Sequence, residues 1–229
     1  MGEKFENLPT PEEREERKEI LTEMKEIAHS ESPSPKEDWD LIWVLSGPEK
    51  SPADAPGQGK RNENKDRLET AFKIAKAVVA LRLGREKEDI TQKEIASFGP
   101  DVYFNGLDDQ NDALRDLIEK GFLENYDFPK EKFIISANLG LKHTGDQFEK
   151  IEESVLAGKR KIAIVSSLYH LPRIRRYVKM HQKKIDLEKI ILYSAEPRQI
   201  PVGAGLGEIK KIPRYEGEGI LPSKSKYKK

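Results

Sequence analysis

The sequence predicts an α/β protein of three layers, in which helices cover both faces of a doubly wound, mainly parallel sheet of five strands. Five short apolar runs have the length of strands, and they alternate with segments in which apolar residues recur at helical spacing. The runs are nearly continuous, which is typical of strands that are covered on both faces. They are Asp40–Ser46, Asp101–Gly106, Lys132–Asn138, Lys161–Ser167 and Lys189–Ala195.

An added helix is expected before the first strand. Thr10 is a suitable N-cap, Pro11 fits the first helical position, and Glu13 closes a capping box. The apolar positions that follow share one face, so we expect this helix to pack against the domain. These positions are Ile20, Leu21, Met24 and Ile27.

The segments between the strands read as helices. Three of them are expected to end at glycine, a residue common at helix C-termini, namely at Gly84, Gly121 and Gly158. Their apolar positions run from Leu68 to Leu83, from Leu114 to Ile118 and from Phe148 to Leu156, and Ile174 to Val178 mark a fourth helix. Thr91 and Glu94 predict a capping box for a short extra helix before the second strand.

These elements divide the chain into three parts. Residues 1–36 are the N-terminal helix and its linker, 37–200 the α/β domain, and 201–229 an irregular C-terminal extension with a basic tail. The glycines of Gly203–Gly207 favour a flexible loop. Residues 48–66 form a long polar stretch without a period, which we interpret as a lid over the site, with disorder as the alternative.

Composition excludes several classes of function. The 41 lysines and arginines balance 41 aspartates and glutamates, so no overall field attracts nucleic acid or anionic lipid. The absence of cysteine excludes disulfides, thiolate catalysis and cysteine metal sites. No metal-ligand spacing, Walker loop or G-x-G-x-x-G motif is present. Apolar runs are no longer than strands, and the first residues are polar, so we expect a cytoplasmic protein without membrane contact.

Small polar residues end four of the five expected strands. Ligands of open parallel sheets bind beyond the carboxyl ends of the strands, where helix N-termini point. Such residues let a ligand approach backbone amides, although they also suit ordinary turns. The predicted ligand-binding positions are Ser46, Gly47, Asn105, Gly106, Asn138, Ser166 and Ser167.

The stretch SSLYHLPRIRRY follows the fourth strand directly. His170 and Arg173 lie three residues apart at an expected helix start, so a proton carrier and an anion clamp could share one side. A packed or capping imidazole is the alternative for His170. Thr144 is the expected N-cap of the preceding helix, with Gln147 reciprocating, and places Lys142 and His143 on the same rim.

These residues together resemble the YdcF/SanA/ElyC family of Rossmann-like domains of unknown function. The likeness runs from about Asp40 to Tyr177 and includes VLSG, DRLETA, Asn105-Gly106 and the TGDQ helix start. Its most specific part is SSLYHLPR, which is similar to the family's T-S-x-x-H-x-x-R pattern. The resemblance implies a Rossmann-like fold and one pocket lined by Arg67, Thr144, Asp146, Ser167, His170 and Arg173.

The chain also departs from the family pattern. Relatives commonly have a double glycine after the first strand and Ser-Gly-Gly after the second, where this chain has Ser46-Gly47-Pro48 and Asn105-Gly106-Leu107. Asn138 replaces an acidic residue usual after the third strand. If that carboxylate is catalytic in relatives, this chain uses altered chemistry or none.

Three functions remain open from the sequence. The leading one is an enzyme for a small phosphorylated or nucleotide-like ligand, with His170 as acid or base, Asp146 orienting His170 or a substrate hydroxyl, and anion contacts from Arg67, Lys142 and Arg173. The second is a non-catalytic binding protein for a nucleotide or adenosyl ligand, such as an S-adenosylmethionine-type ligand. The third is a scaffold that uses the N-terminal helix and basic tail for a protein partner. The sequence identifies no cofactor and no oligomeric state.

Overall fold

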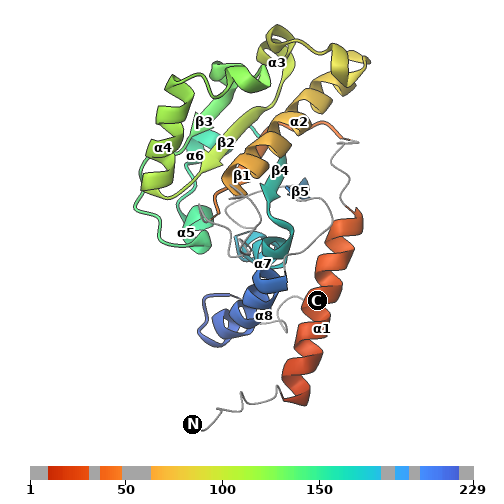
Figure 1. Ribbon diagram of the computed structural model, residues 1–229, viewed down its shortest axis with the longest axis vertical. Helices are drawn as coiled ribbons and strands as arrows, with labels where there is room; N and C mark the ends of the chain where they lie inside the picture. Colours follow the sequence, from red (N-terminus) through yellow and green to blue (C-terminus); the bar gives the residue numbers. More distant parts are fainter. Residues whose placement is uncertain (1–9, 31–36, 48–62, 182–188, 196–201, 222–229) are drawn as a thin grey trace, which may run out of the picture.

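The computed structural model describes residues 10–30, 37–47, 63–181, 189–195 and 202–221 (Figure 1). Its five strands form one all-parallel sheet in the order β3-β2-β1-β4-β5, which confirms the predicted fold class. The order reverses direction between β1 and β4, which makes their carboxyl ends the topological switch point of the sheet. The strands are β1 (Leu41–Leu45), β2 (Asp101–Asn105), β3 (Phe133–Ile135), β4 (Lys161–Ser166) and β5 (Lys189–Ser194).

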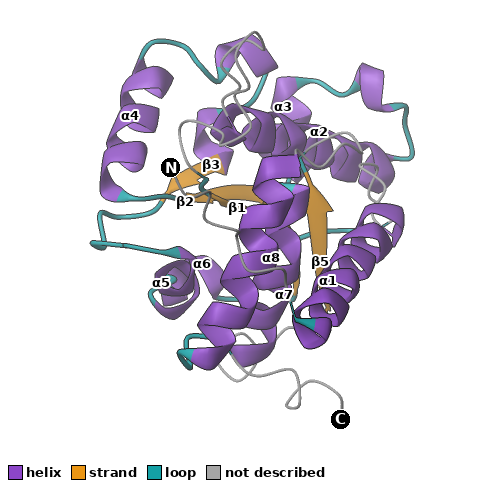
Figure 2. Ribbon diagram, turned by 60° about the horizontal axis from the view of Figure 1, so that its bottom comes forward, coloured by secondary structure: helices purple, strands orange, loops and turns teal. Residues whose placement is uncertain are grey.

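Helices cover both faces of this sheet (Figure 2). One face packs against α2 (Glu63–Leu83), α3 (Gln92–Phe98) and α4 (Asp108–Glu119). The other face packs against α5 (Thr144–Glu149), α6 (Glu153–Leu156) and α7 (Leu171–Met180). Short 3₁₀ turns complete the connections at Lys87–Asp89, Glu124–Tyr126, Lys130–Lys132 and Leu168–His170.

The central strand shows why a continuous apolar run was needed. All five residues of β1 are fully buried. Ile42 and Val44 point into the core beneath α2, whereas Leu41, Trp43 and Leu45 belong to the core beneath α7. Because alternate side chains face opposite sides of a sheet, only apolar residues at every position satisfy both cores.

Two further helices pack at the end of the domain where the strands finish. Helix α1 (Pro11–Ser30) and helix α8 (Val202–Gly217) flank α7 at the lower end of Figure 1. Ile20 and Met24 of α1 form a small apolar cluster with Tyr169, Ile209 and Ile212. The predicted docking of the N-terminal helix is therefore confirmed for these two residues, whereas Leu21 is 40% exposed and Ile27 lies outside the described side chains.

The prediction of an irregular C-terminal extension was wrong, and so was the flexible loop at Gly203–Gly207. Residues 202–217 form α8 despite its glycines and the internal Pro213. Burial of Ile209 and Ile212 stabilises the helix through tertiary packing, which outweighs weak local propensity. The basic tail from 222 onward lies outside the described residues.

Two element boundaries also differ from expectation. The helix predicted across Phe148–Leu156 is divided into α5 and α6, because Ile151 turns into the core and Glu152 accepts a hydrogen bond from the Tyr103 hydroxyl at 3.0 Å. Helix α2 begins at Glu63, inside the stretch predicted as a lid, of which 48–62 lie outside the described residues. The Thr91–Glu94 capping box is confirmed. None of the described helices could cross a membrane.

Candidate functional site at the switch point of the sheet

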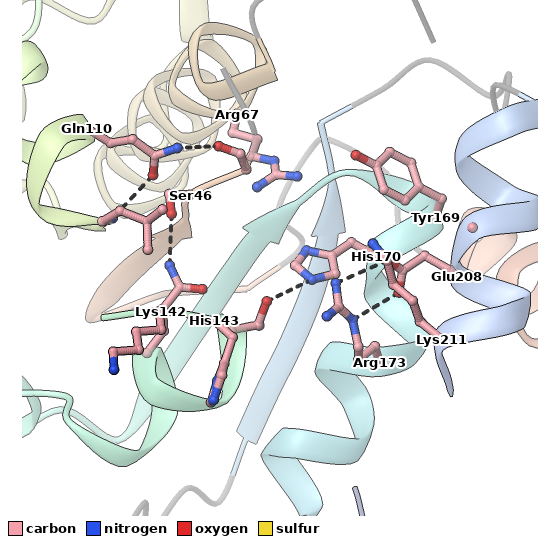
Figure 3. Close-up of a pocket in the computed structure, with 15 residues that line it drawn as sticks. Ser46, Arg67, Gln110, Lys142, His143, Tyr169, His170, Arg173, Glu208 and Lys211 are labelled. Atoms are coloured by element: carbon pink, nitrogen blue, oxygen red, sulfur yellow. Dashed lines mark hydrogen bonds and ion pairs between the residues drawn. The ribbon is translucent and has the colours of Figure 1, made fainter. Parts of the chain in front are cut away.

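A cavity of about 320 Å³ opens at the carboxyl ends of β1 and β4 (Figure 3). Its volume lies at the lower end of the range of about 300–1,000 Å³ that is usual for small-molecule sites. Seven predicted site residues line it, contributed by the end of β1 and the first turns of α2, α5 and α7 or the residues just before them. These are Ser46, Gly47, Arg67, Lys142, Thr144, His170 and Arg173.

Arg67 is a fully buried cation in the wall of the cavity. Its Nη1 donates to the Leu45 carbonyl oxygen at 2.7 Å, and its Nη2 lies 2.9 Å from Glu63 Oε2. Nε and Nη2 also donate to Ser167 Oγ, at 3.1 and 2.7 Å. The guanidinium therefore fastens the start of α2 to the ends of β1 and β4 while one side of it lines the cavity.

Glu63 is the shared acceptor of this network. Its carboxylate accepts from the Ser167 hydroxyl at 2.8 Å and from the Tyr169 hydroxyl at 2.7 Å, in addition to Arg67. Both Glu63 and Arg67 are almost wholly buried. A buried charge pair persists only when its remaining donors and acceptors are satisfied, and the two hydroxyls meet this requirement.

Gly47 lets the guanidinium approach the backbone. A Cβ atom at this position would lie 2.6 Å from Arg67 Nη1, so any larger residue would push the arginine out of the wall. The Gly47 carbonyl oxygen accepts from Gln110 Nε2 at 2.7 Å, and Ser46 Oγ accepts from Gln147 Nε2 at 3.0 Å. These amides fix the turn after β1 against α4 and α5.

His170 is held between two hydroxyl groups. Its Nδ1 lies 3.0 Å from Ser166 Oγ and its Nε2 lies 3.2 Å from Thr144 Oγ1. Burial, followed by the positive charges of Arg173, Arg67 and Lys211, lowers the pKa of His170 well below its ordinary value of 6.5. The imidazole is therefore neutral near pH 7 and has a free lone pair to accept a proton, although its lowered pKa makes it a weaker base than an exposed histidine.

Arg173 faces a carboxylate from α8. Its Nε lies 2.9 Å from Glu208 Oε2, and its Nη2 donates to Glu208 Oε1 at 3.1 Å. Lys211 Nζ lies 3.3 Å from the same Oε1 atom. Gly207, Glu208 and Lys211 all line the cavity, so α8 closes the side of the site opposite β1 (Figure 3).

Asp146 does not make the contact with His170 that was predicted as one of its two possible roles. Its carboxylate accepts from the backbone N–H groups of Lys142 and His143, at 2.7 and 3.3 Å, and it does not line the cavity. It serves as the reciprocal acceptor of a capping box in which His143, rather than Thr144, is the N-cap. Because His143 takes the capping position, the Thr144 hydroxyl is left to contact His170, and Gln147 is left to bond Ser46.

The positions predicted beyond β2 and β3 also lie outside the cavity. Asn105 is buried and donates to Tyr103 Oη and to the Gln147 carbonyl oxygen, at 3.2 and 3.3 Å. The Gly106 N–H donates to Asn111 Oδ1 at 3.0 Å. Asn138 is exposed and bonds Arg115 and Asp112, at 3.1 and 3.0 Å. Ser166 and Ser167 are buried behind the wall and act through His170 and Arg67.

Several site residues were not predicted from the sequence. Glu63 lies in the polar stretch before the first apolar position of α2, although its spacing of four residues from Arg67 is that of a helical ion pair and could have indicated it. Glu208 and Lys211 lie in the segment that was expected to be irregular. Tyr169, Gln147 and Gln110 carry no local signal, because their roles depend on partners from other elements.

No protein-family model, no curated protein and no solved structure matches this chain. The resemblance to the YdcF/SanA/ElyC family therefore stays a prediction. Among the described residues, no group of three or more histidine, aspartate or glutamate side chains is placed to hold a metal ion.

Proposed function

We propose that this protein is an enzyme that binds a small phosphorylated or nucleotide-like ligand at the switch point and uses His170 as a general base. The observation that carries the proposal is a neutral imidazole in a cavity lined by four cationic side chains. The cations would bind the ligand's phosphate oxygens. The same charges keep the imidazole unprotonated, and a bound anion would offset them and so raise the proton affinity of the imidazole. The cations are Arg67, Lys142, Arg173 and Lys211.

The hydroxyl contacts support the direction of proton transfer. In the tautomer with its proton on Nδ1, His170 donates to Ser166 Oγ and accepts at Nε2 from Thr144 Oγ1. Ser166 is fully buried and orients the imidazole ring, a role that the sequence analysis assigned to Asp146. A substrate hydroxyl that takes the place of the Thr144 hydroxyl would donate its hydrogen bond to Nε2, the basic nitrogen of His170.

The binding half of the proposal is tested through Lys142, an exposed cation on the cavity rim. Pyrophosphate, ADP and sugar phosphates are screened by thermal shift, since a ligand bound only by the folded state raises the melting temperature. Lys142→Ala should then weaken binding of the best ligand by about 10-fold or more, because a charged hydrogen bond contributes about 1.5–3 kcal/mol. Lys150→Ala, also an exposed lysine of this segment but outside the cavity, is the matched control and should bind normally. No protection by any anionic compound would rule out the site as proposed.

The catalytic half is tested through His170. His170→Gln should keep most of the affinity, while turnover of the bound ligand falls by a factor on the order of 10²–10⁴. Unchanged turnover would show that His170 is not the base. A non-catalytic binding protein for a nucleotide or adenosyl ligand is the second candidate, because both ring nitrogens of His170 already contact hydroxyls. Ligand protection without any turnover would favour it.

The scaffold function receives less support from the described residues. Ile20 and Met24 of α1 are buried against Tyr169 and α8, so this apolar face is already occupied within the chain. The basic tail lies outside the described residues.

A further inference from the structure

Glu208 places a carboxylate where an anionic ligand would bind. It is 1% exposed, lines the cavity, and is contacted on both oxygens by Arg173 and on one of them by Lys211. Arg173 makes one hydrogen bond, from Nη2 to Oε1, and one ion-pair contact without a hydrogen bond, from Nε to Oε2. Arginine recognises phosphates and carboxylates through charge-assisted contacts of this kind. Arg173 and Lys211 thus form an anion subsite that is occupied by the protein's own Glu208 side chain (Figure 3).

A second glutamate of α8 makes a comparable ion pair outside the cavity. Glu216 Oε1 lies 3.1 Å from Nε of Arg176, which follows Arg173 by one helical turn on α7. Arg176 in turn binds Glu23 of α1 at 2.9 Å, and neither Arg176 nor Glu216 lines the cavity. Both pairs join α8 to α7, but only the Arg173–Glu208 pair lies in the cavity.

The energetics of burial indicate that the Arg173–Glu208 pair adds little net stability. Removing a carboxylate and a guanidinium from water costs several kcal/mol, and their attraction does little more than offset this cost. Apolar residues of similar size would hold α8 as well, as Ile209 and Ile212 already do. Stability alone therefore gives little reason for a charge pair in the wall of a ligand site.

We propose that Glu208 is an internal ligand of the Arg173–Lys211 subsite, and that a phosphate group of the ligand binds there by displacing it. This inference rests on the proposed function of the cavity. Displacement keeps the buried arginine paired in both states, since one anion replaces another. It also lowers the affinity for weak anions, because the subsite is open for only a fraction of the time.

Displacement has a consequence for α8. Its Gly207, Glu208 and Lys211 line the cavity, so release of the carboxylate removes one of the ion pairs that hold the first half of the helix on α7. Ile209 and Ile212 lie within the same turns as Glu208. The helix should therefore loosen when the subsite is filled, whereas the rest of the cavity wall should become more protected.

The first experiment measures pyrophosphate affinity by calorimetry for the unmodified protein, Glu208→Gln and Glu216→Gln. Glu208→Gln should bind on the order of 10-fold more tightly, because it weakens the competitor while leaving both cations. Glu216→Gln removes the same charge from the same helix and should bind as the unmodified protein does. Equal or weaker binding by Glu208→Gln would overturn the inference while leaving the proposed function intact. If no variant binds any phosphate compound, the proposed function fails and the inference fails with it.

The second experiment needs no variant and so does not depend on whether Glu208→Gln folds. Amide hydrogen exchange is followed in the unmodified protein with and without saturating pyrophosphate. Residues 207–217 should exchange faster when pyrophosphate is bound, and α7 should exchange more slowly. Slower exchange across 207–217 would show that α8 closes over the ligand, and unchanged exchange would show that the Glu208 ion pair is not released; either result would overturn the inference.

Discussion

The carboxyl edge of the sheet has two halves, and in both of them the sequence places small polar residues at the ends of the strands. On the β1 and β4 half, the strand ends are followed by a cavity whose wall contains a buried arginine network and a neutral imidazole. On the β2 and β3 half, the strand ends are equally rich in small polar residues, but these bond other groups of the protein. Asn111 bonds Ser136 and the Gly106 N–H, and Asn105 bonds Tyr103 and the Gln147 carbonyl oxygen. The side chains of Asn105, Asn111 and Ser136 do not line the cavity.

This difference shows that small polar residues at strand ends are not sufficient to form a ligand site. On both halves the small polar residues satisfy turns and backbone groups, as such residues commonly do. What distinguishes the first half is the reversal of strand order, which separates the helices above β1 and β4. Charged side chains from α2, α7 and α8 then converge on the space that is left.

The largest expected effect comes from replacing one arginine on each half. Arg67→Ala should lower the free energy of unfolding by about 3–5 kcal/mol, because it leaves the Glu63 carboxylate buried without its cation. Arg115→Ala on the other half removes a partly exposed guanidinium that bonds Asp112, Asn138 and the Ser136 carbonyl oxygen, and should cost less, about 1–2 kcal/mol. Urea denaturation measures both values.

A reversed order of these two effects would contradict the comparison. If Arg67→Ala is too unstable to purify, Arg67→Lys is the informative variant, since it keeps the charge but cannot contact Glu63, Ser167 and the Leu45 carbonyl together. The free energy of unfolding of Arg67→Lys should be lower than those of the unmodified protein and Arg115→Ala, but this variant should still fold.

A change on the β2 and β3 half should separate stability from binding. Asn111 is fully buried; it accepts from the Gly106 N–H and donates to Ser136 Oγ, each at 3.0 Å. Asn111→Ala should therefore cost about 1–3 kcal/mol of stability, because buried polar partners lose their hydrogen bonds. Affinity for a phosphate ligand should not change. A loss of affinity greater than the loss expected from partial unfolding would show that the two halves form one site.

The fold could be predicted because it depends on local patterns. Apolar runs of strand length and helical periods between them specify strands, helices and their alternation, and right-handed crossovers leave few ways to assemble them. Buried Trp39 and Trp43 needed no special signal, since they lie in or beside such a run. Helix α8 was missed because its glycines and Pro213 disfavour a helix locally, while the burial that stabilises it comes from α1 and Tyr169.

The site could be predicted only in part, for the same reason. His170 and Arg173 were found because they follow a strand end directly. The partner of Arg173 lies 35 residues further along the chain, and the partners of His170 come from two other elements, so no spacing in the sequence encodes them. Asp146 was assigned to His170 because the family resemblance implies that both line one pocket, whereas the backbone N–H groups of Lys142 and His143 bind its carboxylate.

The smallest expected effect is a pH dependence that originates on the β1 and β4 half. The pKa of His170 is lowered by burial and by Arg173, Arg67 and Lys211, so below pH 6.5 the unfolded chain binds a proton that the folded protein does not. Stability attributable to His170 is therefore fully present above pH 6.5 and is lost as the pH falls toward the lowered value. For a single proton the slope is at most about 1.4 kcal/mol per pH unit.

Comparison with His170→Gln isolates this contribution from other titrating groups. Urea denaturation of both proteins between pH 7.5 and pH 5 should show a steeper loss of stability in the unmodified protein, and the difference should grow as the pH falls. Parallel curves would mean that His170 titrates in the folded protein as it does in the unfolded chain. That result would contradict the lowered pKa of His170, whereas an imidazole of ordinary pKa would still be mostly neutral at pH 7 and could serve as a base.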